Sequence, residues 1–354
     1  MNENNHKNNV CLLCGQNDSH IIYSKLRGYQ EPNMFDIYYC GHCNTSYAFP
    51  HCDTEKLYEL IYSNGTAVPG YHRYWKFADV VKKISNPLQY LAEKESPYWA
   101  VNKAVSEYAN NIKKNPRIIE IGSGLGYFTY AFKKAGYNII GLDISEKAVE
   151  NAKQRYGDYY ISGDLYKYSI ENSGLYDLVI LTEVIEHLED ISSFISALTK
   201  LIQPKGQIII TTPNKSIYPS TAIWVSDFPP VHYWWLSKES FVYIAKKLNM
   251  KVSFVDFTDF YKNNFTIENI DFNKDISKRS AVFNITGDLL ISRNKSGTVS
   301  DFQLFLIGIK RIKIIHYIYN KLKKYILILK HIRHSNVIIF GKDGYICAIL
   351  QKSI

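Results

Sequence analysis

The segment RIIEIGSGLGYF, residues 117–128, sets the architecture of this protein. An apolar strand runs into three glycines, Gly122, Gly124 and Gly126, and a helical pattern follows at once. Glycine lets a backbone turn sharply from strand to helix and approach a bound ligand closely, so the loop predicts a ligand site. A dinucleotide fingerprint would need glycine where Tyr127 stands, and no P-loop lysine follows. A pyrophosphate or a nucleoside triphosphate therefore fits poorly.

On both sides of this loop, short apolar runs alternate with helical patterns. This alternation predicts an α/β fold, in which a doubly wound parallel sheet is covered by helices on both faces. A last strand pairs antiparallel and completes a sheet of seven. Strands are expected at 117–121, 138–142, 159–162, 177–181, 207–211, 251–257 and 345–350, and helices at 127–135, 146–155, 191–202 and 238–248.

Two acidic residues end the strands that follow the glycine loop. Asp143 closes the second expected strand, and Asp164 closes the third. A carboxylate beside the loop can accept both hydroxyls of a ribose, and the next one can accept the exocyclic amine of an adenine. A blander interpretation stays open for each, because Asp143 could cap a helix and Asp164 could end a turn.

Together these segments resemble the class I S-adenosylmethionine-dependent methyltransferases. The similarity continues from residue 117 to about residue 257 through IIEIGSGLGYFTYAFKKAG, NIIGLDIS, YISGD, YDLVILTEVIEHLED and LIQPKGQIIITTPN. The resemblance implies an enzyme with a Rossmann-like core that binds S-adenosylmethionine. The cofactor-binding residues it implies are Glu120, Gly122, Ser123, Gly124, Gly126, Asp143, Ile144, Asp164, Thr182 and Glu183.

The strand at 177–181 leads into a second polar group of side chains. If a helical turn begins here, Glu183, Glu186 and His187 share one face, and His232 occurs further along the chain. His187 or Glu186 could be a general base, with His232 as a further catalytic candidate. Alternatively, the four residues could bind Mg²⁺, a pattern similar to that of ubiquinone-pathway O-methyltransferases and small-RNA 2′-O-methyltransferases. A purely structural role is the third alternative.

Four of the six cysteines lie near the N-terminus in two C-x2-C pairs: Cys11 with Cys14, and Cys40 with Cys43. Two thiolates on each of two tight turns can surround one Zn²⁺ in a closed tetrahedron. A closed shell leaves no position for substrate, so we expect a structural zinc ribbon. This front end resembles the zinc-binding module of some bacterial sugar and natural-product methyltransferases.

The chain of 354 residues carries a formal charge of +9, and the charge is unevenly placed. Residues 301–335 hold eight Lys and Arg against one Asp, and apolar residues recur among them at helical spacing. We expect a basic amphipathic helix at 309–333 that either packs on protein or contacts an anionic membrane surface. No signal-peptide pattern occurs in the first ten residues, which predicts a cytoplasmic protein, at the inner face of the membrane if the helix binds lipid.

These features divide the chain into six expected parts: a disordered tail at 1–10, a zinc ribbon at 11–52, a helical cap and linker at 53–114, the methyltransferase core at 115–257, an insertion at 258–340 and a final strand at 341–354. Aromatic residues of the cap are expected to cover the substrate cleft.

The predicted function is methyl transfer from S-adenosylmethionine to a small-molecule acceptor. We expect a sugar or a lipid-linked glycan intermediate of surface-polysaccharide or natural-product biosynthesis. An RNA 2′-O-methyltransferase is one alternative, although nucleic acid is an unfavoured partner because the positive charge is confined to one segment. A non-catalytic zinc-ribbon scaffold is the other. The sequence sets neither the acceptor atom nor the oligomeric state.

Overall fold

The protein is described here by a computed structural model. It describes residues 9–68, 70–224, 228–263, 267–269, 279–290, 338–340 and 344–352. The expected amphipathic helix at 309–333 lies outside the described residues.

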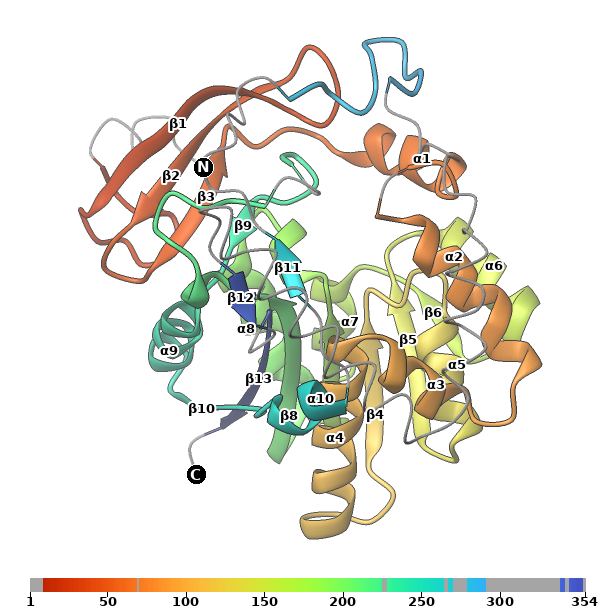
Figure 1. Ribbon diagram of the computed structural model, residues 1–354. Coiled ribbons are helices and arrows are strands. Elements are labelled where there is room, and N and C mark those ends of the chain that lie inside the picture. The colour runs from red at the N-terminus through yellow and green to blue at the C-terminus, as the bar shows by residue number, and fades with distance from the viewer. Residues whose placement is uncertain are drawn as a thin grey trace.

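A seven-stranded sheet forms the centre of the molecule, in the order β10-β13-β8-β7-β4-β5-β6 (Figure 1). Strand β13 is antiparallel to both of its neighbours, and the pairs from β8 to β6 are parallel. The expected α/β sheet with an antiparallel last strand is therefore confirmed. Its strands are β4 (Arg117–Ile121), β5 (Asn138–Asp143), β6 (Tyr160–Ser162), β7 (Tyr176–Thr182), β8 (Ile202–Pro213), β10 (Met250–Phe254) and β13 (Tyr345–Lys352).

Side chains of the central strands alternate between two apolar cores. Leu178 and Ile180 of β7 pack on one face with α3–α6, whereas Val179 and Leu181 pack on the other face with α8 and α9. This period of two buries both faces of the sheet, as parallel strands between helices require. The helices are α3 (Pro87–Lys94), α4 (Ser96–Asn111), α5 (Tyr127–Lys134), α6 (Glu146–Tyr156), α8 (Ile191–Leu201) and α9 (Lys238–Lys247), with α7 (Leu165–Glu171) as a short helix that the sequence pattern did not predict.

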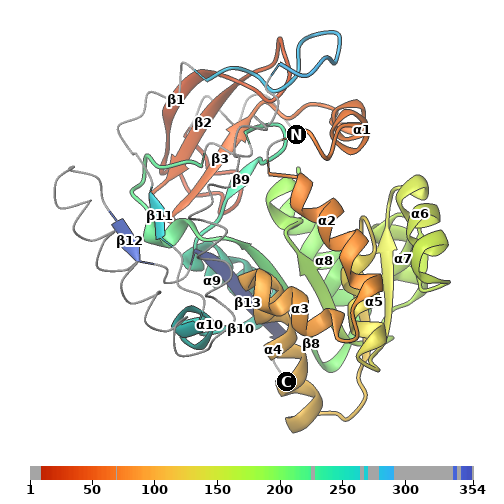
Figure 2. The same ribbon diagram turned by 45° about the vertical axis from the view of Figure 1, so that its right-hand side comes forward.

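The Cys-rich front end forms a second, antiparallel sheet that includes a strand from the core. Strands β1 (Ser19–Arg27), β2 (Met34–Cys40) and β3 (Thr45–Phe49) are followed in the sheet by β9 (Trp234–Trp235). Tyr47 pairs with Trp234, and the two views place this sheet beside the carboxyl ends of the central strands (Figures 1 and 2). The front end is thus joined to the segment that carries His232.

Between the two sheets the chain forms α1 (Glu55–Ser63) and α2 (His72–Val80), followed by the short 3-10 helix η2 (Val81–Lys83). In Figure 2, α1 lies above α2 and to the right of the small sheet. These two helices contribute aromatic side chains to the cavity described below.

The described part of the expected insertion also contacts the front end. It includes α10 (Thr258–Asn263) and the antiparallel pair β11 (Ile267–Asn269) and β12 (Ile338–Phe340). Residues 281–283 are buried, and the Val282 amide donates to the Tyr29 carbonyl at 2.8 Å. Within the residues that the structure describes, no helix has the length and apolar character needed to cross a membrane.

Candidate functional site

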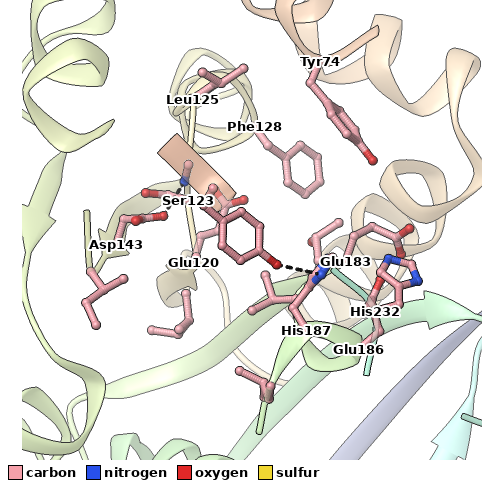
Figure 3. A pocket seen from close by; sticks show the side chains of 18 of the residues that line it. Tyr74, Glu120, Ser123, Leu125, Phe128, Asp143, Glu183, Glu186, His187 and His232 are labelled. Carbon is pink, nitrogen blue, oxygen red and sulfur yellow. Dashed lines mark hydrogen bonds between the residues drawn. The ribbon is translucent and has the colours of Figure 1, made fainter. Parts of the chain in front are cut away.

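A cavity of about 700 Å³ lies at the carboxyl ends of β4, β5 and β7 (Figure 3). The glycine loop and Asp143 line one side, and Glu186, His187 and His232 line the other. The sequence-predicted cofactor and catalytic residues, apart from Gly126, are among its lining residues. Ligands of open α/β sheets bind at this edge, where the strand order reverses.

The glycine loop requires glycine for two separate reasons. Gly122 has φ +73° and Gly126 has φ +77°, a left-handed region that other residues rarely adopt. A Cβ on Gly122 would also lie 2.7 Å from Val184, and one on Gly126 would lie 2.6 Å from Ala152. Side chains at these positions would push the loop away from the sheet edge.

Asp143 ties the glycine loop to the next strand. Its carboxylate accepts from the Gly124 amide at 2.7 Å and from the Ser145 amide at 2.9 Å. Burial raises the pKa of Asp143, against the lowering effect of these two hydrogen bonds. The cap of α6 is Ser145, not Asp143, so the capping alternative for Asp143 does not hold.

Asp164 does cap a helix. Its side chain accepts from the Lys167 amide at 2.9 Å, at the start of α7. The residue also lines the cavity, so capping and ligand contact are compatible here. Next to Asp143, Ile144 lines the same cavity and is 78% exposed.

Glu120, at the end of β4, is 4% exposed and accepts from the hydroxyl of Thr129. Burial raises the pKa of Glu120 to about 8. The side chain is therefore protonated at neutral pH, because a charged carboxylate would be poorly solvated at this depth.

The polar stretch after β7 does not have the geometry expected from its spacing. Glu183 has φ +55° and precedes a 3-10 turn, η3 (Ile185–His187), so it does not share a helical face with Glu186 and His187. Its carboxylate accepts from Thr211 at 3.2 Å. The Thr182 hydroxyl is buried and has no hydrogen-bond partner among the described residues.

Instead, Glu186 and His187 converge with His232. One ligand atom from each of the three lies within 4.8 Å of the others, and Glu183 is not part of this set. The rings of His187 and His232 are 4.6 Å apart at their centroids, in an edge-to-face arrangement (Figure 3). The buried carboxylate of Glu186 accepts from Thr212 at 3.0 Å.

Backbone contacts to the segment 231–234 position this group. Nδ1 of His187 bonds the Val231 carbonyl, and the Tyr233 amide donates to the Glu186 carbonyl at 2.9 Å. A carbonyl only accepts, so the proton of neutral His187 belongs on Nδ1 and the lone pair on Nε2. Tyr58 of α1 places its hydroxyl 3.1 Å from the same Nδ1.

Sequence reasoning missed the wall formed by Tyr218 and Trp224. Lys215 holds this wall, since its buried ammonium donates to the carbonyls of Pro219, Ser220 and Ala222. Burial lowers the pKa of Lys215 to about 7. In the sequence Lys215 stands among the polar residues TTPNKS, and a lysine there usually indicates a surface position.

The four N-terminal cysteines form a second candidate site. All four are buried and their sulfurs lie within 4.8 Å of one another. The Cys11 and Cys43 sulfurs are 3.7 Å apart, as are those of Cys14 and Cys40, too far for a disulfide. A tetrahedron with metal–sulfur bonds of about 2.3 Å has edges of about 3.8 Å, so the quartet fits one tetrahedral metal ion.

This quartet is attached to the core through α9. The Cys43 carbonyl accepts from Ser237 at 3.1 Å and from Ser240 at 3.3 Å, the two residues of the α9 capping box. Tyr243 of the same helix donates to the Cys14 carbonyl at 3.0 Å. Both C-x2-C pairs are therefore held by α9, a helix that packs on the larger sheet.

Comparisons with known proteins agree with this arrangement. Residues 91–253 match the family model described as a methyltransferase domain. The ubiquinone biosynthesis O-methyltransferases of Colwellia psychrerythraea and Dictyostelium discoideum are 33% and 30% identical, over 28% and 31% of this chain. The matched stretches span 43% and 41% of those two relatives, less than half of their length.

Among solved structures, a SAM-dependent methyltransferase from Archaeoglobus fulgidus is 19% identical with a TM-score of 0.36, and covers 71% of this chain and 93% of its own. The plantazolicin methyltransferase BpumL, solved with SAH, is 16% identical with a TM-score of 0.39, at 85% and 99% coverage. Residues 91–253 are thus similar to a methyltransferase domain, and the strand order and glycine loop of this chain fit a Rossmann-like methyltransferase fold.

Proposed function

We propose that this protein transfers the methyl group of S-adenosylmethionine to a hydroxyl of a small-molecule acceptor. The observation that carries the proposal is a single cavity with the glycine loop and Asp143 at one side and His187 at the other. One hollow can therefore hold a donor and an acceptor together. Holding two reactants in line can supply about 7–11 kcal/mol of the barrier reduction.

On the donor side, the glycine loop and Ser123 would lie against the methionine portion of the cofactor. Asp143 would accept the ribose hydroxyls, and Asp164 and Ile144 would contact the adenine. Glu120, Thr182 and Glu183 complete this side. When bound, the cofactor supplies a methyl group on a positively charged sulfur, which is already activated for transfer.

On the acceptor side, His187 would be the general base. As the acceptor oxygen bonds the methyl carbon and the carbon–sulfur bond breaks, Nε2 of His187 takes the hydroxyl proton. The Val231 carbonyl keeps the other ring proton on Nδ1, and Glu186 lies close enough to stabilise the positive charge that forms. His232 would orient the acceptor next to this base.

A metal ion at the same residues is the second candidate mechanism, because the three ligand atoms of Glu186, His187 and His232 cluster. Two imidazoles and one carboxylate suit a transition metal better than Mg²⁺, which prefers oxygen ligands. We therefore favour the base over Mg²⁺. Activity that survives exhaustive chelation, with zinc retained in the cysteine quartet, would exclude the metal mechanism.

The proposed acceptor is a sugar or a lipid-linked glycan. Aromatic side chains line the cavity, and aromatic rings suit the flat faces of sugars: Tyr71, Tyr74 and Trp75 of the cap, and Tyr218 and Trp224 of the wall held by Lys215. Contact with a membrane through 309–333 remains part of this proposal. We also propose that the cysteine quartet binds a structural Zn²⁺.

Calorimetry with S-adenosylhomocysteine tests the donor side. We expect the Asp143→Ala variant to bind at least about 10-fold more weakly, since it loses charge-assisted hydrogen bonds. Asp158→Ala, at an exposed ion pair with Lys153, is the matched control and should bind like the wild type. Wild-type protein that does not bind would overturn the proposed function.

The acceptor is tested by incubating the protein with labelled donor and an extract of the organism that makes it. Mass spectrometry of the labelled product then gives the acceptor class and the methylated atom. A labelled nucleic acid in place of a small molecule would contradict the proposed acceptor and favour an RNA methyltransferase.

A further inference from the structure

Arg73, in the first turn of α2, has the opposite charge to the rest of the cavity wall. It is the one Lys or Arg among the described residues that line the cavity. Four other acidic residues line the same space besides the protonated Glu120: Asp143, Asp164, Glu183 and Glu186. A positively charged sulfur suits this acidic wall, but the wall alone does not explain a guanidinium.

The guanidinium uses few of its donors within the protein. One nitrogen donates to the Tyr74 hydroxyl at 2.9 Å, and another lies 3.9 Å from Glu95, beyond hydrogen-bond distance. Nε is buried and has no hydrogen-bond partner among the described residues. The side chain is 37% exposed, on the cavity that it lines.

Such a group is incomplete without a ligand. A guanidinium offers five N–H donors in a planar fork that matches the two oxygens of an oxyanion. Leaving such donors unpaired at a partly buried position costs free energy. Tyr98 and Tyr127, whose hydroxyls bond each other, line the cavity beside Arg73 and add no negative charge at neutral pH.

We propose that Arg73 binds an oxyanion of a molecule that occupies the cavity, an inference that rests on the proposed function. Two molecules could supply it. One is the donor, through the carboxylate of its methionine portion. The other is the acceptor, through a carboxylate or a phosphate.

Three probes separate these sources: S-adenosylhomocysteine, 5′-methylthioadenosine, which has no carboxylate, and inorganic pyrophosphate. Each is titrated by calorimetry into wild-type protein, Arg73→Gln and the control Arg155→Gln. Arg155 also faces a carboxylate, Asp79 at 3.2 Å, but on the surface and outside the cavity. Arg73→Lys, which keeps the charge without the fork, is the second variant if Arg73→Gln does not fold.

If the donor supplies the oxyanion, Arg73→Gln should bind S-adenosylhomocysteine about 10- to 100-fold more weakly than the wild type. Its affinity for 5′-methylthioadenosine should be unchanged. If the acceptor supplies it, Arg73→Gln should bind both nucleosides as tightly as the wild type. After saturation with S-adenosylhomocysteine, wild-type protein and Arg155→Gln should still bind pyrophosphate, whereas Arg73→Gln should not. Equal weakening of both nucleosides, or no difference from Arg155→Gln with any probe, would overturn the proposal. Wild-type protein that binds pyrophosphate through Arg73 but neither nucleoside would instead overturn the proposed function alone.

Discussion

The two sides of the cavity differ in how their residues are distributed along the chain. On the donor side, Gly124 bonds Asp143 at a separation of 19 residues, and Thr129 bonds Glu120 at 9. On the acceptor side, Tyr58 meets His187 at a separation of 129 residues. A local unit thus builds the donor site, whereas the acceptor site exists only once distant segments have assembled.

The acceptor side also depends on the small sheet. The segment 231–234 bonds the η3 turn through Val231 and Tyr233 and pairs with β3 through Trp234. The Cys43 carbonyl lies at the other end of this connection, held by α9. The comparison therefore predicts that damage to the small sheet affects the proposed base and spares the donor site.

The largest effect is expected for His187→Gln, which removes the proposed base and leaves the donor side intact. Methyl transfer into extract should fall about 10²- to 10⁴-fold, the usual contribution of a general base. The affinity for S-adenosylhomocysteine should be unchanged. His20→Gln, at an exposed histidine of β1 that faces Tyr39, is the control. Near-normal transfer by His187→Gln would exclude this residue as the base.

Cys40→Ser should have the next largest effect. It removes one thiolate from the quartet, which lies outside the cavity. Loss of a metal ligand destabilises the small sheet, and a shift of the base by about 1 Å can cost about 10²-fold in rate. We expect less than half of the wild-type zinc by elemental analysis, slow transfer and normal S-adenosylhomocysteine binding.

Cys52→Ser is the matched control, since Cys52 is half-buried beside Tyr233 and outside the quartet. It should retain its zinc. If Cys40→Ser instead loses donor affinity as severely as transfer rate, the two sides of the cavity are not separable.

A third, smaller effect concerns the donor side and pH. The pKa of Glu120 is raised from 4.5 to about 8 in the folded protein, so the folded state holds this proton more tightly than the unfolded state. The free energy of unfolding that this bound proton contributes is complete below pH 4.5 and is lost as the pH rises through about 8. Each pKa unit corresponds to about 1.4 kcal/mol.

Thermal unfolding at several pH values between 5 and 8 measures this effect. Wild-type protein should lose a few kcal/mol across the window, and Glu120→Gln, which is neutral at every pH, should lose less. Asp164→Asn, at an exposed helix cap, controls for the removal of a carboxylate. Parallel curves for wild type and Glu120→Gln would contradict the protonated state of Glu120.

The same difference in sequence separation explains what the sequence could predict. The seven strands and the glycine loop follow from local apolar runs and glycines, and the structure contains each of them. The helical face of Glu183 with Glu186 and His187 was wrong, because the left-handed backbone at Glu183 depends on contacts that the spacing does not encode. The sequence patterns did not predict strand β9, the hydrogen bonds of Lys215 or the wall at Trp224. Each of these features is defined by partners that lie elsewhere in the fold.

The smallest expected effect tests the join between the two sheets. Ser240→Ala removes a buried hydroxyl that bonds Thr45 at 2.7 Å and the Ser237 amide at 2.9 Å, at a cost of about 1–2 kcal/mol in unfolding free energy. Ser145→Ala, the cap of α6 on the donor side, should cost a similar amount. Because Ser240 bonds the Cys43 carbonyl and Ser145 has no contact with the quartet, only Ser240→Ala should release zinc faster to a chelator. Equal zinc release from the two variants would mean that the stability of the quartet does not depend on its attachment to α9. The cysteines and the proposed base would then be connected by contacts but not coupled in free energy.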